Sequence, residues 1–390
     1  MTLGHTRAPC SGQSVPPVFA AALACTILFW GAQAYAQDLR PARFCGACHG
    51  PIRREWESSA MAKSAKNPVF LAFLADARAA LGDTVTAGCV SCHAPAAAVT
   101  ADYKLESSVS QEGVTCNFCH NVSAVDPSPK PASYTFDGTD PLLMRGPYKE
   151  ADPGSAHRYV YSEIHTKGEF CSACHEYASD GGAGAAIEPT YSNWRRSGAA
   201  AKGKQCQDCH MAPYAGQAAP KISKNHREQV HGHSFPGPRN GQRLDSVATL
   251  SAKVEGGRLK LTVSNHRAGH TLPGGGGGMR LIQLTVAFFG LSGDSIQGED
   301  VQTYGIRYAD AKGNSPVPKW LARTIVHRAE IPSDSAAVEW CDIPARAKRA
   351  EARLVYYFID PAYLGSMNRQ HVDLAGHLPV VMARATAKLP

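Results

Sequence analysis

Residues 45–64 read CGACHGPIRREWESSAMAKS, and the pattern of the first five letters occurs four more times along the chain. The five copies share the spacing Cys-x-x-Cys-His and read CGACH (45–49), CVSCH (89–93), CNFCH (116–120), CSACH (171–175) and CQDCH (206–210). With 16 histidines among 390 residues, a histidine after every pair would arise by chance with a probability on the order of 10⁻⁷. The repetition therefore indicates a shared chemical role for the five copies.

Paired cysteines also suit disulfides or a zinc site, but neither requires a histidine directly after each pair. A c-type haem requires two thiols for its vinyl groups and an adjacent imidazole for its iron. The sequence therefore predicts five covalently attached haem c groups. The predicted attachment cysteines are Cys45, Cys48, Cys89, Cys92, Cys116, Cys119, Cys171, Cys174, Cys206 and Cys209. The predicted proximal iron ligands are His49, His93, His120, His175 and His210.

Five macrocycles attached between residues 45 and 210 must pack on one another, because so short a segment cannot wrap each one separately. Closely packed haems pass single electrons between them. The net charge of +7 needs no nucleic acid to explain it, because five haems would bring about ten carboxylates that basic residues balance. We expect redox proteins as partners and no nucleic acid.

The second axial ligand of each iron must come from elsewhere in the chain. His157 and His165 precede the fourth motif and lie near Tyr159 and Tyr161, which could line a haem face. The run NHREQVHGHSFPG offers His231 and His233, which are favoured over His226 because a Phe-Pro-Gly turn follows them.

Later histidines are weaker candidates. His270, in SNHRAGHTLPG with His266, suits either a loop-borne ligand or a hydrogen bonder that caps a turn. His327 lies in a predicted strand, and His371 and His377 lie in the tail, so we expect structural or solvated roles for these three.

Met61 follows the first motif by twelve residues, on a helix expected to point it back towards the haem of His49. A buried methionine is more often ordinary packing. The next helix is bounded by Asn67 as N-cap, Pro68 in its first turn and Gly82 as its stop.

The chain begins with an apolar run, VPPVFAAALACTILFW, followed by a small-x-small site ending at Ala36. We interpret residues 1–36 as a signal peptide, so the protein is predicted to be exported, to the periplasm or the outside of the cell, with no membrane span in the mature chain. An uncleaved anchor and a lipid attached at Cys25 are the alternatives.

Residues 37–243 form the predicted pentahaem cytochrome c domain, a haem-packed arrangement of helices and loops. After 243 the chain alternates apolar and polar residues in RLKLTVS (258–264), RLIQLTVAFF (280–289), ARTIVHRAEI (322–331), AAVEWCDI (336–343) and ARLVYYFID (352–360). Residues 244–390 are therefore predicted to form an antiparallel β-sandwich. The fold class is mixed, and Cys341 is expected to be an inert buried thiol.

Several longer stretches resemble one known family. They are W-x-x-S-x-M at 56–61, EGVTCNFCH (112–120), MRGPYKE (144–150), EFCSACHE (169–176), CQDCHMAP (206–213) and NHRAGHTLPGG (265–275). They look like the multihaem c-type cytochromes related to the tetrahaem cytochrome that accepts electrons from hydroxylamine oxidoreductase.

In such relatives a histidine that ligates iron is common at the position of Met61. This resemblance implies a His49/Met61 haem of raised potential, because a thioether favours ferrous iron. The same W-x-x-S pattern recurs at Trp194 and Ser197 with Ala199 in the ligand position, so that turn supplies no ligand.

The function favoured by the sequence is one-electron transfer between respiratory partners. One alternative is a multihaem oxidoreductase that acts on a small nitrogen or sulfur compound at an open-faced haem. Another is a homo-oligomer or haem filament, in which a neighbouring subunit supplies a ligand.

Overall fold

The computed structural model describes residues 39–128, 132–137, 140–178, 186–223, 227–238, 241–275, 278–366, 372 and 377–390. The predicted signal peptide, His226 and His371 lie outside these residues. No helix among the described residues is long and apolar enough to cross a membrane.

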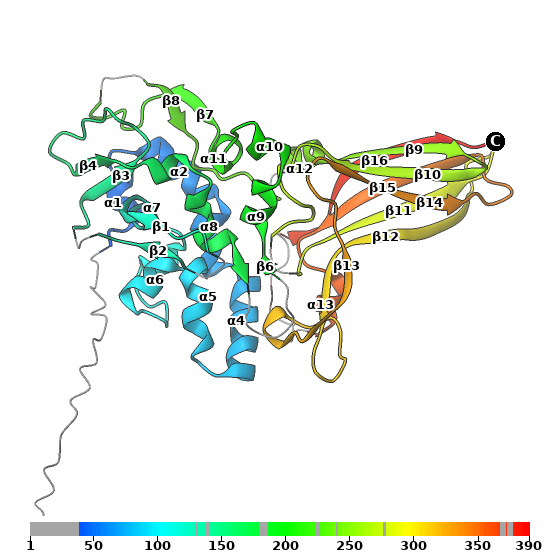
Figure 1. Cartoon of the computed structure of the whole chain (residues 1–390), viewed down its shortest axis with the longest axis horizontal. Helices are drawn as coiled ribbons and strands as arrows, with labels where there is room; N and C mark the ends of the chain where they lie inside the picture. The colour runs from blue at the N-terminus through cyan, green and yellow to red at the C-terminus, as the bar shows by residue number, and fades with distance from the viewer. Residues whose placement is uncertain are drawn as a thin grey trace, which may run out of the picture. The chain divides into compact units, whose positions relative to one another are not determined.

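Short helices dominate the blue-to-green part of the chain in Figure 1. They are α1 (Ala42–Gly46), α2 (Gly50–Ser58), α3 (Ala60–Lys63), η1 (Ser64–Lys66), α4 (Pro68–Leu81), α5 (Val85–His93), α6 (Pro95–Thr100), η2 (Ser110–Glu112), α7 (Cys116–Asn121), η3 (Glu163–Thr166), α8 (Glu169–His175), α9 (Thr190–Arg195), α10 (Gly198–Ala201) and α11 (Cys206–His210). Most of these helices are too short to be stable alone in water, so they depend on their surroundings.

The predicted boundaries of the longest of these helices, α4, are confirmed. The Asn67 side chain accepts hydrogen bonds from the backbone of Val69 and Phe70, and Pro68 is the first helical residue. The helix stops at Gly82, whose φ of 82° a residue with a side chain rarely adopts.

Small two-stranded sheets connect the short helices. They pair β1 (Ala124–Val125) with β2 (Tyr134–Thr135), β3 (Leu143–Gly146) with β4 (Arg158–Tyr161), β5 (Tyr177–Ala178) with β6 (Ala186–Glu188), and β7 (Pro213–Gly216) with β8 (Arg227–His231). The β3–β4 pair is parallel, and the other three pairs are antiparallel.

The yellow-to-red part of the chain in Figure 1 holds the long strands. A five-stranded antiparallel sheet has the order β13 (Thr324–Ala329), β12 (Ser295–Ala309), β11 (Leu281–Phe289), β15 (Arg349–Tyr357), β16 (Val380–Lys388). A three-stranded antiparallel sheet has the order β14 (Ser335–Asp342), β10 (Arg258–Asn265), β9 (Thr249–Glu255). Helix α12 (Gly241–Val247) precedes them, and η4 (Lys319–Leu321) and α13 (Pro361–Ser366) lie between strands.

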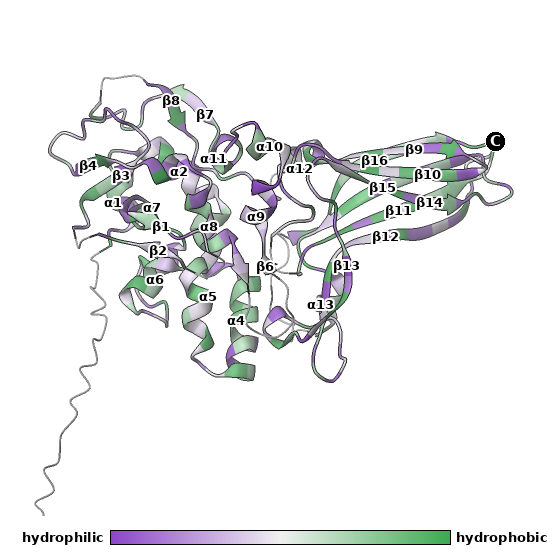
Figure 2. Ribbon diagram, in the orientation of Figure 1, coloured by the Kyte–Doolittle hydropathy of each residue, from purple (hydrophilic) through white to green (hydrophobic). Residues whose placement is uncertain are grey.

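One large apolar core joins these strands. Leu259 and Leu261 of β10, Ile282 of β11 and Leu354 of β15 are fully buried in the same cluster, together with Leu244 of α12. Figure 2 shows the green bands of apolar residues along these strands. The mixed fold with many antiparallel strands agrees with the sequence prediction, whereas the sandwich itself and the domain boundary at 243/244 stay predictions.

A smaller cluster connects the two parts of the chain. Val69 and Phe73 of α4 pack with Ile359 and Tyr363 from the region around α13. Trp320 of η4 meets the Phe73 ring edge-on, with the ring centroids 5.4 Å apart. Helix α4 thus lies against the strand-rich part of the chain.

Candidate haem-attachment site

All five Cys-x-x-Cys-His motifs lie on short helices or at their ends. Helix α1 ends within the first motif, α5 and α8 end at the histidines of the second and fourth, and α7 and α11 contain the third and fifth. Helical spacing places residues i, i+3 and i+4 on one face, so both thiols and the imidazole of a motif face the same side. All eleven cysteines in the described part of the chain are free thiols.

Thiols of different motifs lie close enough to change each other's pKa. A hydrogen bond with Cys116 lowers the pKa of Cys45 and correspondingly raises the pKa of Cys116. A second such bond, to Cys174, lowers the pKa of Cys92 to about 7. The first and third attachment points are therefore neighbours, as are the second and fourth.

The fourth motif has further neighbours. Cys171 and Cys206 share a hydrogen bond that raises the pKa of Cys171 and lowers that of Cys206. The pKa values of Cys171 and Cys174 rise mainly through their thiol contacts and burial, and the nearby Cys119 adds to both. The fourth motif thus adjoins the second, third and fifth, and all five attachment points form one connected cluster.

Three pairs of histidine rings have centroid separations close to those of two imidazoles bound to one metal ion. With a metal–nitrogen bond of about 2 Å on each side, two imidazoles on one metal have centroids roughly 6 Å apart. The centroids of His49 and His157 are 6.2 Å apart. Those of His120 and His165 are 6.0 Å apart, and those of His120 and His233 are 6.4 Å apart.

In three of the five predicted proximal ligands, a backbone carbonyl group holds the Nδ1 atom. His49 donates to Ala218 O at 2.9 Å, and His120 donates to Arg145 O at 2.5 Å. His210 does the same to Pro236 O at 2.7 Å. An Nδ1–H bonded in this way fixes the ring orientation and leaves Nε2 as the atom that can bind a metal.

Four predicted distal ligands show the same arrangement. The Nδ1 atoms of His157, His231, His233 and His270 each lie 2.8–3.0 Å from a backbone carbonyl oxygen. His165 differs, because its Nε2 bonds Cys119 O at 3.1 Å and its Nδ1 is buried with no hydrogen-bond partner in the described part of the chain. The donor set fits haem iron, because the macrocycle supplies four nitrogens and the protein needs to supply only one or two ligands.

Burial keeps several of these imidazoles neutral, which is the form that binds a metal. Burial, together with Lys319 and His175, lowers the pKa of His93 to about 4. Burial and the neighbouring His120 have the same effect on His165 and His233, lowering both pKa values to about 4.

In the folded chain, the backbone of Met61 lies beside segments of the second and third motifs. Its carbonyl oxygen accepts from Val114 N at 3.1 Å and from Ser64 Oγ at 2.9 Å. Ser64 Oγ also donates to the carbonyl of His93 at 2.6 Å, and the ring of Phe70 stacks on His93 at 4.2 Å. Because His157 faces His49, the geometry favours His157 at the place that the sequence assigned to Met61, and the His49/Met61 pair stays a prediction.

The remaining histidines lie away from the motifs or contact other groups. His266 is exposed. His327 of β13 donates from Nε2 to Thr303 O at 2.9 Å, and His377 packs edge-on against Phe358. In the described part of the chain, no group of three or more His, Cys, Asp or Glu side chains is arranged to hold a metal ion by itself.

A cavity of about 330 Å³ lies beside the first attachment point. Its lining includes Trp56, Glu112 and three cations, Arg43, Arg53 and Lys66. Burial raises the pKa of Glu112, while the Ala42 N–H and the three cations act in the opposite direction. The sequence alone did not point to these three cations, although EGVTCNFCH contains Glu112.

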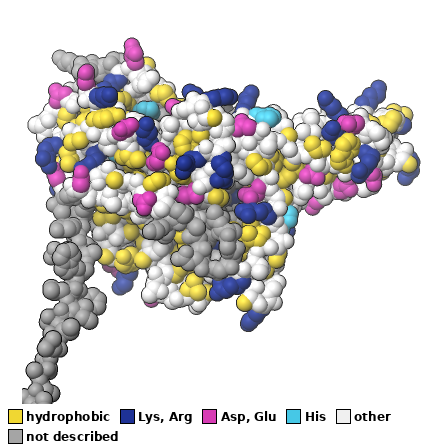
Figure 3. Space-filling view, viewed as in Figure 1, with side chains coloured by type: hydrophobic (Ala, Val, Ile, Leu, Met, Phe, Trp, Pro, Cys, Tyr) yellow, Lys and Arg dark blue, Asp and Glu magenta, His cyan; other side chains and the backbone are white. Residues whose placement is uncertain are grey.

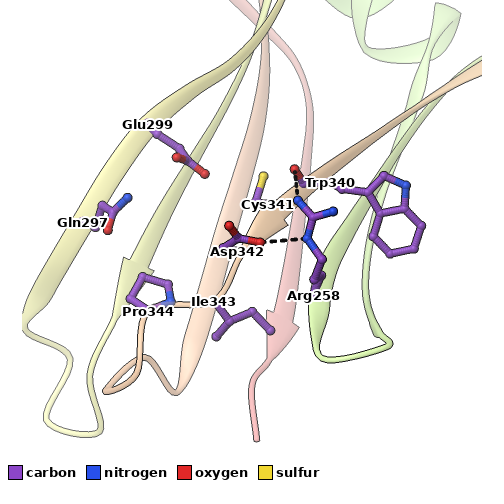
Figure 4. Close-up of a pocket in the computed structure, with 8 residues that line it drawn as sticks. All are labelled: Arg258, Gln297, Glu299, Trp340, Cys341, Asp342, Ile343 and Pro344. Carbon is purple, nitrogen blue, oxygen red and sulfur yellow. Dashed lines mark hydrogen bonds and ion pairs between the residues drawn. The ribbon is translucent and has the colours of Figure 1, made fainter.

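A second cavity of about 330 Å³ lies among the long strands, away from the haem motifs. Figure 4 shows Arg258 reaching Asp342, with Cys341 and Glu299 close by. Burial and a hydrogen bond to Glu299 raise the pKa of Cys341 to about 12, which keeps this thiol protonated.

Lys and Arg side chains are dispersed over the face in Figure 3 rather than gathered into one patch.

The family model for cytochrome c554 and c-prime matches residues 44–121, which hold the first three motifs. In fold, the chain is similar to a penta-heme cytochrome c552 from Thermochromatium tepidum, with a TM-score of 0.68 and 19% sequence identity. That match covers 91% of this chain and 100% of the other.

Two superoxide reductase structures match far less well. Neelaredoxin from Archaeoglobus fulgidus has a TM-score of 0.19 and 14% identity, over 38% of this chain and 94% of its own. Another superoxide reductase, in the oxidized state, has a TM-score of 0.18 and 11% identity, over 37% and 87%. These scores are too low to support an inference, and no curated protein matches the chain significantly.

The match to cytochrome c554 and the penta-heme neighbour support a multihaem c-type cytochrome. The more specific relation to the tetrahaem partner of hydroxylamine oxidoreductase stays a prediction.

Proposed function

We propose that this chain is an exported pentahaem c-type cytochrome that carries single electrons between redox proteins in the periplasm or outside the cell. The observation that carries the proposal is the connected cluster of five attachment points. When bound, the haems supply one-electron chemistry. The protein residues hold the irons, orient the ligands and exclude water.

The thiol contacts support an order of haems along the electron path. The first haem adjoins the third through Cys45 and Cys116. The third adjoins the fourth through Cys119, and the fourth also meets the second and fifth. Electrons that enter at the first haem would therefore reach the second or fifth through the third and fourth.

The imidazole geometry supports six-coordinate iron in at least two places. We assign His157 opposite His49 and His233 opposite His120, because each pair has the separation expected for two ligands of one iron. His233 is favoured over His165 at the second place because its Nδ1 bonds the His231 carbonyl, which leaves Nε2 for iron. His165 and His231 stay predicted ligands of other haems.

Export follows from residues 1–36 as a signal peptide. The mature protein is then expected to begin at Gln37. Amino-terminal sequencing of protein recovered from the periplasm or the medium tests this. A mature chain that still carries Cys25 would indicate an anchor or a lipid instead.

The haem content and spin state test the function. The mass of the intact holoprotein should exceed that of the mature chain by five haem groups. The oxidised protein should give low-spin EPR signals at neutral pH, and the reduced protein should bind little carbon monoxide. Fewer than five haems would contradict the proposal.

The same measurements separate the carrier from the two alternatives. A high-spin haem that binds nitrite or carbon monoxide in the wild type would favour an oxidoreductase. Coordination that changes with protein concentration would favour a filament.

A further inference from the structure

Two tryptophans occupy matching places in the haem-binding part of the chain. Trp56 Nε1 donates to the carbonyl of Val114 at 2.8 Å, and Val114 lies two residues before the third motif. Trp194 Nε1 donates to the carbonyl of Lys204 at 3.0 Å, and Lys204 lies two residues before the fifth motif. The same hydrogen bond therefore joins the tryptophan to the same position before a motif in both cases.

The serine three residues after each tryptophan also has the same role. Ser59 and Ser197 have extended backbones, and each starts a short helix. Ser59 Oγ accepts from Ala62 N at 3.2 Å, and Ser197 Oγ accepts from Ala200 N at 3.2 Å. Both are N-caps of one helical turn.

The residue two places after each serine is fixed by an equivalent backbone bond. Val114 N donates to the Met61 carbonyl at 3.1 Å, and Lys204 N donates to the Ala199 carbonyl at 3.0 Å. Met61 and Ala199 therefore occupy equivalent places beside the third and fifth motifs.

The haem motifs around these turns pair in the same way. The first thiol of one motif meets the first thiol of the other in both cases, Cys45 with Cys116 and Cys171 with Cys206. The first and third motifs, with Trp56 between them, thus form one two-haem unit. The fourth and fifth motifs, with Trp194 between them, form a second.

A backbone anchor also recurs in both units. The N–H three residues before the leading cysteine donates to a side chain that precedes the trailing motif. Ala42 N reaches Glu112 Oε2 at 2.8 Å, and Gly168 N reaches Gln205 Oε1 at 2.8 Å.

The two units differ at the equivalent place. The first has Met61, whose sulfur can bind iron, whereas the second has Ala199, which cannot. Other segments supply His157 and His233 to the first unit in the assignment above. Six-coordinate haems in the second unit likewise need a ligand from another segment, because Ala199 offers none.

A loop from the strand-rich part of the chain covers Ala199. Gly269 has φ of 70°, and a Cβ atom built on it would lie 3.5 Å from Ala199 Cβ. Gly198 N donates to Asp334 Oδ2 at 2.8 Å, and Asp334 N donates to Asn265 O at 2.7 Å. These bonds fix the loop over the start of α10.

His270 follows Gly269 directly, and its surroundings orient it. Asn265 is fully buried, and its Nδ2 donates to His270 O and to Ile331 O, both at 2.9 Å. His270 Nδ1 donates to Thr271 O at 3.0 Å, which assigns Nε2 as the coordinating atom. A Cβ on Gly274 would lie 3.1 Å from the His270 ring, so glycine makes room for the imidazole there.

We propose that the chain contains a duplicated two-haem unit and that His270 supplies to the second unit the distal ligand that Ala199 cannot supply. The acceptor is the haem attached at Cys171–His175 or the haem attached at Cys206–His210. This inference rests on the proposed pentahaem function, and it gives the strand-rich part of the chain a direct role in haem ligation.

The test is the His270→Leu variant of the full-length holoprotein. One haem in five should change from low-spin to high-spin in the ferric EPR spectrum, and the reduced protein should bind one additional carbon monoxide per chain. His266→Leu is the matched control, because His266 is exposed in the same loop. It should leave both measurements unchanged.

A rescue variant separates ligation from a turn-capping role of His270. Adding Ala199→His to His270→Leu places an imidazole at the equivalent of Met61 and should restore the low-spin signal. A structural role would not respond to this change. An unchanged spin state in His270→Leu with all five haems present would overturn the inference.

The number of haems per chain is measured first, by intact mass. A failure of the pentahaem function can then be distinguished from a failure of the His270 inference. Fewer than five haems in the wild type would contradict the pentahaem function itself. If His270→Leu does not accumulate with five haems, His270→Met replaces it. That variant should add a near-infrared sulfur-to-iron band, and a spectrum without the band would overturn the inference.

Discussion

The two parts of the chain are stabilised by different means. The strand-rich part has a continuous core of large side chains, including Phe288, Leu354 and Tyr356, all of which are at most 1% exposed. The haem-binding part has helices of a few residues and a small alanine-rich cluster of Ala65, Val90, Ala94 and Ala97. Such short helices with so little apolar core need another source of order, and covalently attached haems supply it. Four predictions test this contrast.

The largest expected effect follows removal of the fourth attachment point. Cys171→Ser with Cys174→Ser should abolish the order of the haem-binding part, because this motif contacts three others. Limited proteolysis should then cut within 39–238 while the fragment from about 249 to 390 resists. Intact mass reports the haems that remain.

The control removes the second motif through Cys89→Ser with Cys92→Ser. The second motif adjoins only the fourth among the contacts described above, so the other four haems stay connected and proteolysis should be milder. Equal sensitivity of the two double variants would refute the central place of the fourth motif.

Truncation of the apolar core should destabilise the strand-rich part alone. Leu354 is fully buried, so Leu354→Ala should lower the free energy of unfolding by about 2–5 kcal/mol. Urea denaturation followed by fluorescence measures this, and the haem spectrum should not change in native buffer. The control is Val338→Ala, at an exposed position of β14. It should change the free energy of unfolding by less than about 0.5 kcal/mol.

Met61 tests the predicted thioether ligand. If Met61 rather than His157 binds the iron of His49, Met61→His should lower the potential of that haem by roughly 0.1 V, about 2.3 kcal/mol per electron, because imidazole favours ferrous iron less than a thioether does. With His157 as the ligand, as proposed above, Met61→His should leave the haem potentials unchanged. Spectroelectrochemical titration measures the change, with Met61→Leu as the variant that carries no ligand. A wild-type ferric spectrum without a near-infrared sulfur-to-iron band would show that Met61 does not bind iron.

The smallest effect is expected at the start of α4. Asn67→Ala removes the bonds to Val69 N and Phe70 N and should cost about 1 kcal/mol. Thermal unfolding or amide exchange of α4 measures it. Asn67→Asp keeps an acceptor at the N-cap and should be close to wild type, and a loss as large as that of alanine would argue against capping.

Local signals predicted much of this structure. Asn67, Pro68 and Gly82 gave the limits of α4, because capping depends on neighbouring residues only. Alternating apolar residues predicted strands that correspond to β10, β11, β13, β14 and β15. The long strand β12 was missed because Gly298, Glu299 and Asp300 interrupt its alternation.

The ligand geometry could not be predicted in the same way. His49 and His157 are 108 residues apart, and only the fold brings their rings to 6.2 Å. The sequence showed that Trp194 repeats the pattern of Trp56, but only the backbone hydrogen bonds make Ala199 equivalent to Met61. The carbonyl groups that orient these rings belong to Ala218, Arg145 and Pro236. They leave no signal in the sequence, because every residue has the same backbone carbonyl oxygen whatever its side chain.

The contacts between thiols of different motifs have a consequence for biogenesis. If the chain became compact before its thiols had reacted with the haem vinyl groups, Cys45 would lie near Cys116 and Cys92 near Cys174. With a pKa of about 7, Cys92 would be partly thiolate and so ready to cross-link in an oxidising compartment. Haem delivery must therefore outpace compaction, and cells starved of haem should accumulate chains with these wrong disulfides, detectable by non-reducing peptide mapping.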